Sequence, residues 1–120
     1  MTTSYKARPG DIWLAYVRFA DHPNVGKVRP VVIIDKRTTS IVVAKITSAE
    51  PSMQFSYCDL DDWHNEGLVR PSRVQVVPLF QLSDKDLLRH EPLGRLSDRD
   101  RIRLNQALSD RRDHCDRDGS

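Results

Sequence analysis

The hydrophobic positions of the chain fall into short β-branched runs that are separated by polar turns. The run Val31–Ile34 contains no polar residue and predicts a strand over Val28–Asp35 that is covered on both faces. Pro30 fits the start of this strand, because proline cannot donate a hydrogen bond to a sheet ladder. Other segments rich in aromatic or β-branched residues predict further strands at Ile12–Phe19, Ile41–Thr47, Gln54–Cys58 and Arg73–Leu82.

The last part of the chain carries the helical signals. Ser97 is a good N-cap, and Asp100 three residues later forms an acidic variant of the capping box. An apolar side follows, so we expect a helix from about Asp98 to about Arg111. Shorter pieces are expected before it: helical turns at Asp61–Glu66 and Ser83–Arg89, and an extended segment at Leu93–Leu96.

Many short strands followed by one helix are typical of a small curled barrel built from antiparallel hairpins. The expected class is therefore mainly β, as a single domain over residues 1–112, with a disordered charged tail over 113–120. At 120 residues, 38% hydrophobic and 30% charged, the chain has room for one modest core. No apolar run approaches the roughly 20 residues of a membrane helix, and the first residues show no signal-peptide pattern, so we expect a cytoplasmic protein. In that compartment Cys58 and Cys115 are expected to be free thiols.

The net charge of +2 does not by itself indicate a nucleic-acid partner. The basic residues are nevertheless unevenly placed, and most acidic residues lie elsewhere, in 59–62 and after Asp84. A basic face on the strands is therefore expected. Its members lie in or beside the predicted strands: Lys27, Arg29, Lys36, Arg37, Lys45, Arg70 and Arg73.

Arg29 and Thr47 lie at the ends of two strands that are consecutive in the sequence. If these strands pair, the Arg29 guanidinium and the Thr47 hydroxyl come together, and a planar guanidinium is suited to a phosphate. Two plainer interpretations stay open: Arg29 as a surface arginine paired with a carboxylate, and Thr47 as an ordinary β-branched strand residue.

Five segments, in their order and spacing, resemble the MazF/PemK family of toxins from bacterial toxin–antitoxin pairs. They are Gly10–Leu14, Gly26–Ile34, Ala44–Ser48, Gly67–Ser72 and Leu93–Ser97, and the resemblance covers roughly Pro9–Leu108. It implies a small SH3-like β-barrel of the CcdB/MazF type with a C-terminal helix, acting as a homodimer. It also implies a metal-independent, ribosome-independent endoribonuclease that cuts single-stranded RNA at short sequences and inhibits translation.

The family's catalytic arginine falls on Arg29 and its threonine on Thr47. Such chemistry uses the ribose 2′-hydroxyl to attack the adjacent phosphate, and a fixed donor stabilises the charge that builds on the phosphoryl oxygens. His22 is a candidate base because its pKa range suits proton transfer, although a loop histidine is often simply solvated. The loop 23–27 lacks the Glu-Gln pair of well-known members, and Gln75-Val76-Val77 replaces an Arg-x-Asp set of some relatives.

Other polar residues near these strand ends are candidate RNA contacts, which position a backbone without reading its sequence. They are Lys27, Lys45, Ser48, Arg70, Ser72, Arg73 and Gln75. The alternative is an ordinary solvated basic face. Trp63 is the more exposed candidate for base stacking, and Trp13 is expected in the core.

No cofactor or metal is expected, because the acidic stretch Asp59–His64 matches no standard ligand spacing. The implied partners are single-stranded RNA and a cognate antitoxin whose C-terminal segment folds over the groove. Two alternatives stay open: a non-catalytic module of the same fold that inhibits DNA gyrase like CcdB, and an inactive relative that only binds RNA or a protein.

Overall fold

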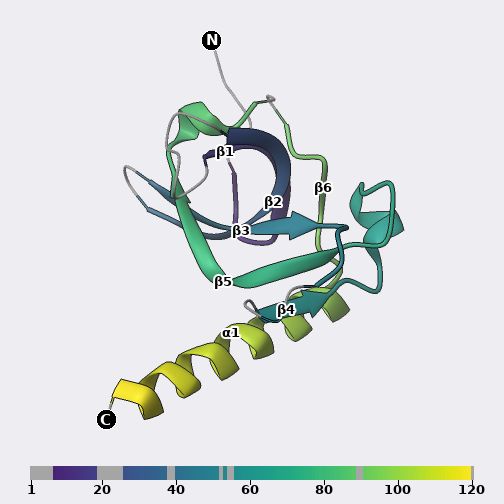
Figure 1. The fold of residues 1–120 in the computed structure, drawn as a ribbon. Helices are drawn as coiled ribbons and strands as arrows, with labels where there is room; N and C mark the ends of the chain where they lie inside the picture. Colours follow the sequence, from purple (N-terminus) through teal and green to yellow (C-terminus); the bar gives the residue numbers. More distant parts are fainter. Residues whose placement is uncertain are drawn as a thin grey trace.

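The computed structural model describes residues 7–18, 26–37, 40–51, 53, 56–88 and 91–119. Within these residues the chain forms one antiparallel sheet, two short 3₁₀ turns and one α-helix (Figure 1). The strands are β1 (Asp11–Arg18), β2 (Gly26–Lys36), β3 (Ile41–Thr47), β4 (Ser56–Asp59), β5 (Arg73–Leu82) and β6 (Gly94–Arg95). The turns are η1 (Trp63–Glu66) and η2 (Asp84–Asp86), and the helix is α1 (Asp98–Gly119).

The sheet is strongly curled. Its strand order is β4-β5-β3-β2-β1-β6, and each neighbouring pair runs antiparallel. Register shifts between Ile33 and Asp35 and between Val43 and Lys45 mark irregularities that help a sheet bend. In Figure 1 β1 and β2 arch over the top, while α1 lies beneath β4 and β5. The predicted mainly β, antiparallel fold with a C-terminal helix is confirmed, and the expected small barrel takes the form of a curled half-barrel.

Two hydrophobic clusters lie on opposite faces of β2. Val31 and Ile33 are buried inside the curl with Trp13 and Val43, whereas Val32 packs on the other face in the cluster that also contains Leu104 of α1. Val31, Val32 and Ile33 are each at most 1% exposed. The strand is therefore covered on both faces, as its continuous β-branched run predicts.

The start of α1 is fastened to the loop that precedes β5. The Ser97 hydroxyl accepts the backbone N–H of Asp100 at 3.2 Å, which is the predicted N-cap. The Asp100 carboxylate, which is fully buried, accepts the backbone N–H groups of Asp61 and Asp62 at 3.1 and 2.9 Å. This network fixes the loop between β4 and β5 against the helix, and we call residues 60–72 the β4–β5 loop.

The structure corrects the end of the last helix. It continues to Gly119, whereas the sequence pattern placed its end near Arg111. The segment after Arg111 contains no proline and no glycine before Gly119, so nothing in it interrupts helical backbone geometry. Residues 113–119, expected as a disordered tail, are thus helical, and the boundary of the domain at residue 112 stays a prediction.

Within the described residues, no helix is long and apolar enough to span a bilayer.

Candidate functional site

The first half of β2 and the ends of β3, β5 and β4 bring polar residues into one row across the sheet. Val31 lies opposite Lys45, and continuing this register by two residues places Arg29 opposite Thr47. Thr47 in turn pairs with Arg73, and Arg73 pairs with Asp59. The predicted pairing of the two strands therefore holds, and the row runs Arg29, Thr47, Arg73, Asp59.

An open groove of about 540 Å³ lies at this end of the sheet. One wall is formed by the first half of β2 and the end of β3, and the other by the β4–β5 loop. Its lining includes the predicted residues Arg29, Thr47, Ser48, Arg70 and Ser72. The apolar part of the lining comes from Val28, Pro30, Ile46, Ala49, Leu68 and Val69.

Arg29 is half-buried in the middle of a strand pair, opposite Ala15 of β1. Its backbone is thus held on one side by β1, and its side chain borders the groove. Among the described residues, no carboxylate forms an ion pair with Arg29. Within this part of the chain the guanidinium is therefore available to an anionic ligand, which favours the phosphate interpretation over the paired surface arginine.

Local hydrogen bonds orient the hydroxyl groups of the groove. The Thr47 hydroxyl accepts the backbone N–H of Ala49 at 3.1 Å, which fixes its oxygen and leaves its own hydrogen to donate. The Ser72 hydroxyl donates to the Arg70 carbonyl at 2.8 Å and braces the turn that presents Arg70. Thr47 is therefore a positioned donor, and Ser72 supports the opposite wall.

Lys45 and Gln75 lie two residues further into the sheet than the Thr47–Arg73 pair. They are paired across β3 and β5, and Gln75 also pairs with Tyr57 of β4. Burial lowers the pKa of the half-buried Lys45 ammonium, and the positive charge of Arg29 lowers it further. Gln75 is only 3% exposed, so the structure offers little of this predicted contact residue to a ligand.

Arg73 and Lys27 differ from the other predicted contacts. The Arg73 guanidinium binds Asp59, with Nε 3.3 Å from the carboxylate, and also donates to the Ala49 carbonyl. Arg73 thus braces the segment that follows Thr47. Lys27 is exposed on β2 opposite Val17 and is not part of the groove lining.

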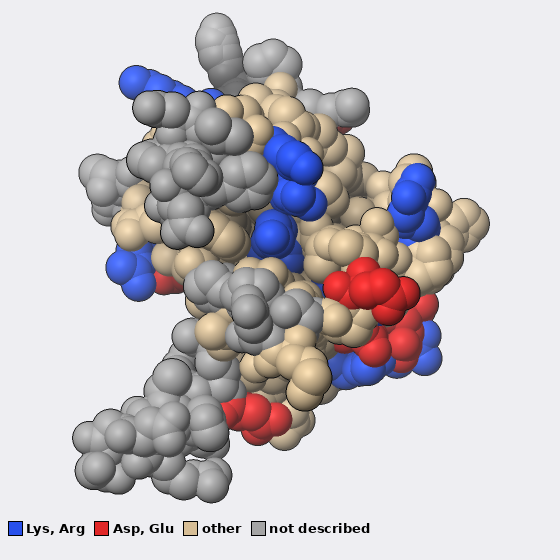
Figure 2. Space-filling view, viewed as in Figure 1, with Lys and Arg blue, Asp and Glu red and all other residues tan. Residues whose placement is uncertain are grey.

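The charge on this side of the molecule is separated. Figure 2 shows Lys and Arg atoms in the middle of the face, over the barrel strands, and Asp and Glu atoms gathered lower down. The expected basic face is thus present over the strands, and acidic groups such as Asp61 and Asp62 lie beside α1, paired with Arg103 and Arg99.

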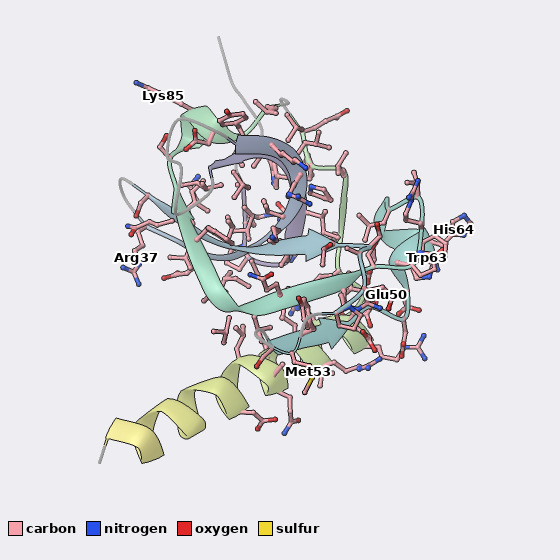
Figure 3. All side chains as sticks on the ribbon, in the orientation of Figure 1. Arg37, Glu50, Met53, Trp63, His64 and Lys85 are labelled. Carbon is pink, nitrogen blue, oxygen red and sulfur yellow. The ribbon has the colours of Figure 1, made fainter. Side chains whose placement is uncertain are left out.

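The two tryptophan candidates are not part of the groove lining. His22 falls outside the described residues. Trp13 is 2% exposed in the core, as expected. Trp63 is half-buried against the cluster under α1, and its ring centroid lies 5.5 Å from that of His64. Figure 3 shows both rings on the η1 lobe, to the side of the strands.

The sequence reasoning missed a buried acidic cluster. One carboxylate oxygen each of Asp62, Glu66 and Asp100 lies within 4.8 Å of the others, an arrangement that could in principle hold a cation. Protein groups already use most of these oxygens: Asp62 accepts the Ser97 hydroxyl at 2.5 Å, and Glu66 Oε2 accepts the Ser97 N–H at 2.8 Å. We interpret the cluster as the structural clasp between the β4–β5 loop and α1. Asp62 and Glu66 are four residues apart, but Asp100 is more than thirty residues further along the chain, so sequence spacing does not reveal the cluster.

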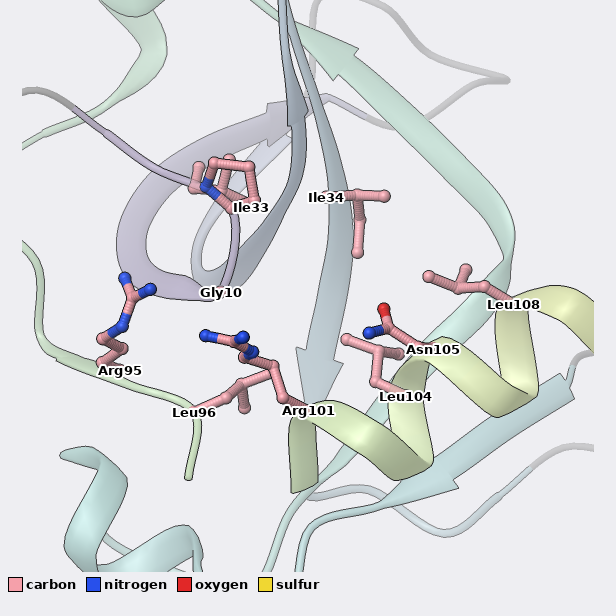
Figure 4. Close-up of a pocket in the computed structure, with 10 residues that line it drawn as sticks. Gly10, Ile33, Ile34, Arg95, Leu96, Arg101, Leu104, Asn105 and Leu108 are labelled. Atoms are coloured by element: carbon pink, nitrogen blue, oxygen red, sulfur yellow. The ribbon is translucent and has the colours of Figure 1, made fainter. Parts of the chain in front are cut away.

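A second pocket, of about 320 Å³, lies between β2 and α1 (Figure 4). Ile33 and Ile34 line one side, and Leu104 and Leu108 line the helix side. Arg95 at its edge is bound to the buried Asp11 at 2.5 Å. The pocket shares no residue with the groove.

Comparison with known proteins supports this fold. No curated protein matches the chain. A solved structure, the Mycobacterium tuberculosis toxin MazF-mt6, matches with a TM-score of 0.67 and 25% sequence identity, over 86% of this chain and 96% of that one. The family model for PemK-like, MazF-like toxins of type II toxin–antitoxin systems matches residues 8–110, which is most of the chain. The chain therefore belongs to this family of toxins.

Proposed function

We propose that this toxin is a metal-independent endoribonuclease that cleaves single-stranded RNA in the groove between β2, β3 and the β4–β5 loop. The observation that carries the proposal is the shared groove of Arg29 and Thr47, a cation and a hydroxyl donor on neighbouring strands. MazF-like toxins are generally endoribonucleases, which agrees with this chemistry. A gyrase inhibitor has no need of such a phosphate-binding pair.

In the proposed reaction the ribose 2′-oxygen attacks the adjacent phosphorus, and the bond to the 5′-oxygen breaks. The products are a 2′,3′-cyclic phosphate and a free 5′-hydroxyl. The Arg29 guanidinium offers two parallel donors to the phosphoryl oxygens, where negative charge grows in the transition state. The Thr47 hydroxyl donates to the same phosphate. The Ala49 N–H binds the hydroxyl oxygen and so holds the hydroxyl in place for this contact.

The groove walls would hold the RNA on either side of the reacting phosphate. Arg70 and Ser48 line the groove and suit flanking phosphates, while the exposed Val69 offers an apolar surface to an unpaired base. Ser72 and Arg73 act indirectly. Ser72 braces the turn that presents Arg70, and Arg73 braces the segment that follows Thr47. We keep Lys27 as an outer contact and His22 as a candidate base.

The family implies a cognate antitoxin as partner and typically a dimer. We propose that the antitoxin covers the groove with an acidic and apolar segment that folds on binding, since the lining alternates apolar residues with Arg29 and Arg70. We place the complex in the cytoplasm, where messenger RNA is available.

The test is cleavage of a long single-stranded RNA by purified protein, with and without a chelator. We expect chelator-resistant cuts at a short motif. Arg29→Ala and Thr47→Val should each slow cleavage by about 10²–10³, because each removes one donor to the transition state. Thr47→Ser, which keeps the hydroxyl, should retain most of the rate.

The matched control is Arg37→Ala. Arg37 is an exposed arginine directly after the end of β2. Its guanidinium lies 3.2 Å from the Asp35 carboxylate, and it is not part of the groove lining. Its loss should leave the rate unchanged. RNA binding without cleavage by the wild type would point to an inactive relative, and neither binding nor cleavage would point to a gyrase-type toxin.

A further inference from the structure

Lys45 is half-buried and neighbours Arg29 and Thr47, two residues that line the groove, although Lys45 is not itself part of the groove lining. It lies two residues before Thr47 on β3, so both side chains project from the same face of that strand. Its partner on β2 is Val31, which makes Arg29 a diagonal neighbour across the strand pair. Diagonal neighbours are about 7–8 Å apart, within reach of long side chains.

Among the neighbours that the structure describes, Lys45 has no counter-charge. On β3 its near neighbours Val43 and Thr47 are uncharged, on β2 it faces Val31 and Arg29, and on β5 it faces the buried Gln75. Among the described residues no carboxylate forms an ion pair with Lys45. Burial and Arg29 both lower its pKa, so this ammonium gives up a proton more readily than a surface lysine.

We propose that Lys45 is a catalytic residue, the general acid that protonates the departing 5′-oxygen of the RNA. The inference rests on the proposed ribonuclease function and extends it. The 2′-oxygen forms its bond to phosphorus and loses its proton to water, while the bond from phosphorus to the 5′-oxygen breaks. Lys45 Nζ gives a proton to that oxygen and becomes neutral, and it then regains a proton from solvent.

This role separates Lys45 from Arg29. An arginine stays protonated at all working pH values and can stabilise charge, whereas a lysine with a lowered pKa can also transfer a proton. The negative charge of a bound phosphodiester keeps the ammonium protonated until the leaving oxygen develops its charge. The structure thus divides charge stabilisation and proton donation between two neighbouring cations.

The test compares two RNA substrates that differ in one atom. One has the normal 5′-oxygen at the scissile position, and the other has a bridging 5′-sulfur, whose thiolate leaves without protonation. Lys45→Arg keeps the positive charge but cannot act as the acid. We expect it to slow single-turnover cleavage of the oxygen substrate by about 10²-fold or more, and to leave cleavage of the sulfur substrate near the wild-type rate.

Lys36→Arg is the matched control, because Lys36 is an exposed lysine at the far end of β2 from the groove. Should the longer guanidinium disturb the fold, seen as a lowered melting temperature, Lys45→Gln replaces it with the same expectation. Equal slowing of both substrates, or no slowing of the oxygen substrate, overturns the role of Lys45 while the ribonuclease function stands. If the wild type cleaves neither substrate, the proposed function fails and the role of Lys45 fails with it.

Discussion

At the scale of single residues, the buried carboxyl of Glu66 is the least ordinary group of the described chain. It is 1% exposed, and its Oε1 atom has no hydrogen-bond partner while Oε2 accepts the Ser97 N–H. Burial, and then the nearby Asp100, raise the pKa of Glu66 to about 7. The neutral acid is therefore the form that the fold favours.

This predicts a pH-dependent stability. The folded protein holds the Glu66 proton more tightly than the unfolded chain does. The contribution of this proton to the free energy of unfolding is therefore full below about pH 4.5 and is lost as the pH rises through about 7. Glu66→Gln, which is neutral at every pH, should flatten this part of the profile. Urea unfolding between pH 4.5 and 8 measures it, and identical profiles for both proteins would show that Glu66 is not the source.

The residue scale also shows what the sequence could reveal of the site. Arg29 and Thr47 were identifiable because both flank hydrophobic runs that locate strands, although β2 in the structure begins earlier, at Gly26, and places Arg29 inside the strand. The hydrogen bond from Ala49 to Thr47 and the burial of Gln75 were not, because they depend on how the strands curl. His22 remains a prediction.

At the scale of elements, α1 is held to the sheet by a narrow contact. Leu104 is 3% exposed in the cluster that also contains Val74 and Val76 of β5, and Ala107 and Leu108 pack at its edge. The first turn is fixed through Ser97 and Asp100 to the β4–β5 loop. The helix therefore supports one wall of the groove from below.

Shortening Leu104 should loosen this support. We expect Leu104→Ala to destabilise the protein by about 2–5 kcal/mol, the range for deleting a buried leucine side chain and leaving a cavity. Ile102→Ala, on the exposed side of the same helix at 66% exposure, should change stability by less than about 0.5 kcal/mol. Chemical denaturation gives both values, and equal losses would contradict the packing described for α1.

The elements also differ in how well their sequences define them. The bounds of β3 and β5 match the expected ranges, because both have clear hydrophobic runs between polar turns. The end of α1 did not, since its last residues are polar and neither a proline nor an early glycine marks a stop. The clasp of Asp62, Glu66 and Asp100 joins segments more than thirty residues apart, which no local pattern encodes.

At the scale of the whole molecule, charge is divided between the strand face and the helix side. Basic groups lie over the strands that form the groove (Figure 2). Near α1 the acidic groups Asp61 and Asp62 are paired with Arg103 and Arg99. Such a face attracts a polyanion mainly through release of its counterions, so binding should weaken as salt rises.

We therefore predict a graded salt dependence of RNA binding. Removing one phosphate contact by Arg70→Ala should reduce the slope of log affinity against log salt by about 0.7, the value for one contact on a single strand. The control Lys85→Ala alters an exposed lysine on η2, away from the groove. Fluorescence anisotropy from 50 to 300 mM salt measures the slopes, and equal slopes for Arg70→Ala and the wild type would remove Arg70 from the interface.

The most direct measurement of the central claim is the chemistry of the RNA ends. The account predicts a 2′,3′-cyclic phosphate on one fragment and a 5′-hydroxyl on the other, produced by the wild type and lost with Arg29→Ala. Fragments ending in a 5′-phosphate would contradict attack by the 2′-hydroxyl. Equal cleavage by wild type and Arg29→Ala would show that the groove between β2 and β3 is not where RNA is cut.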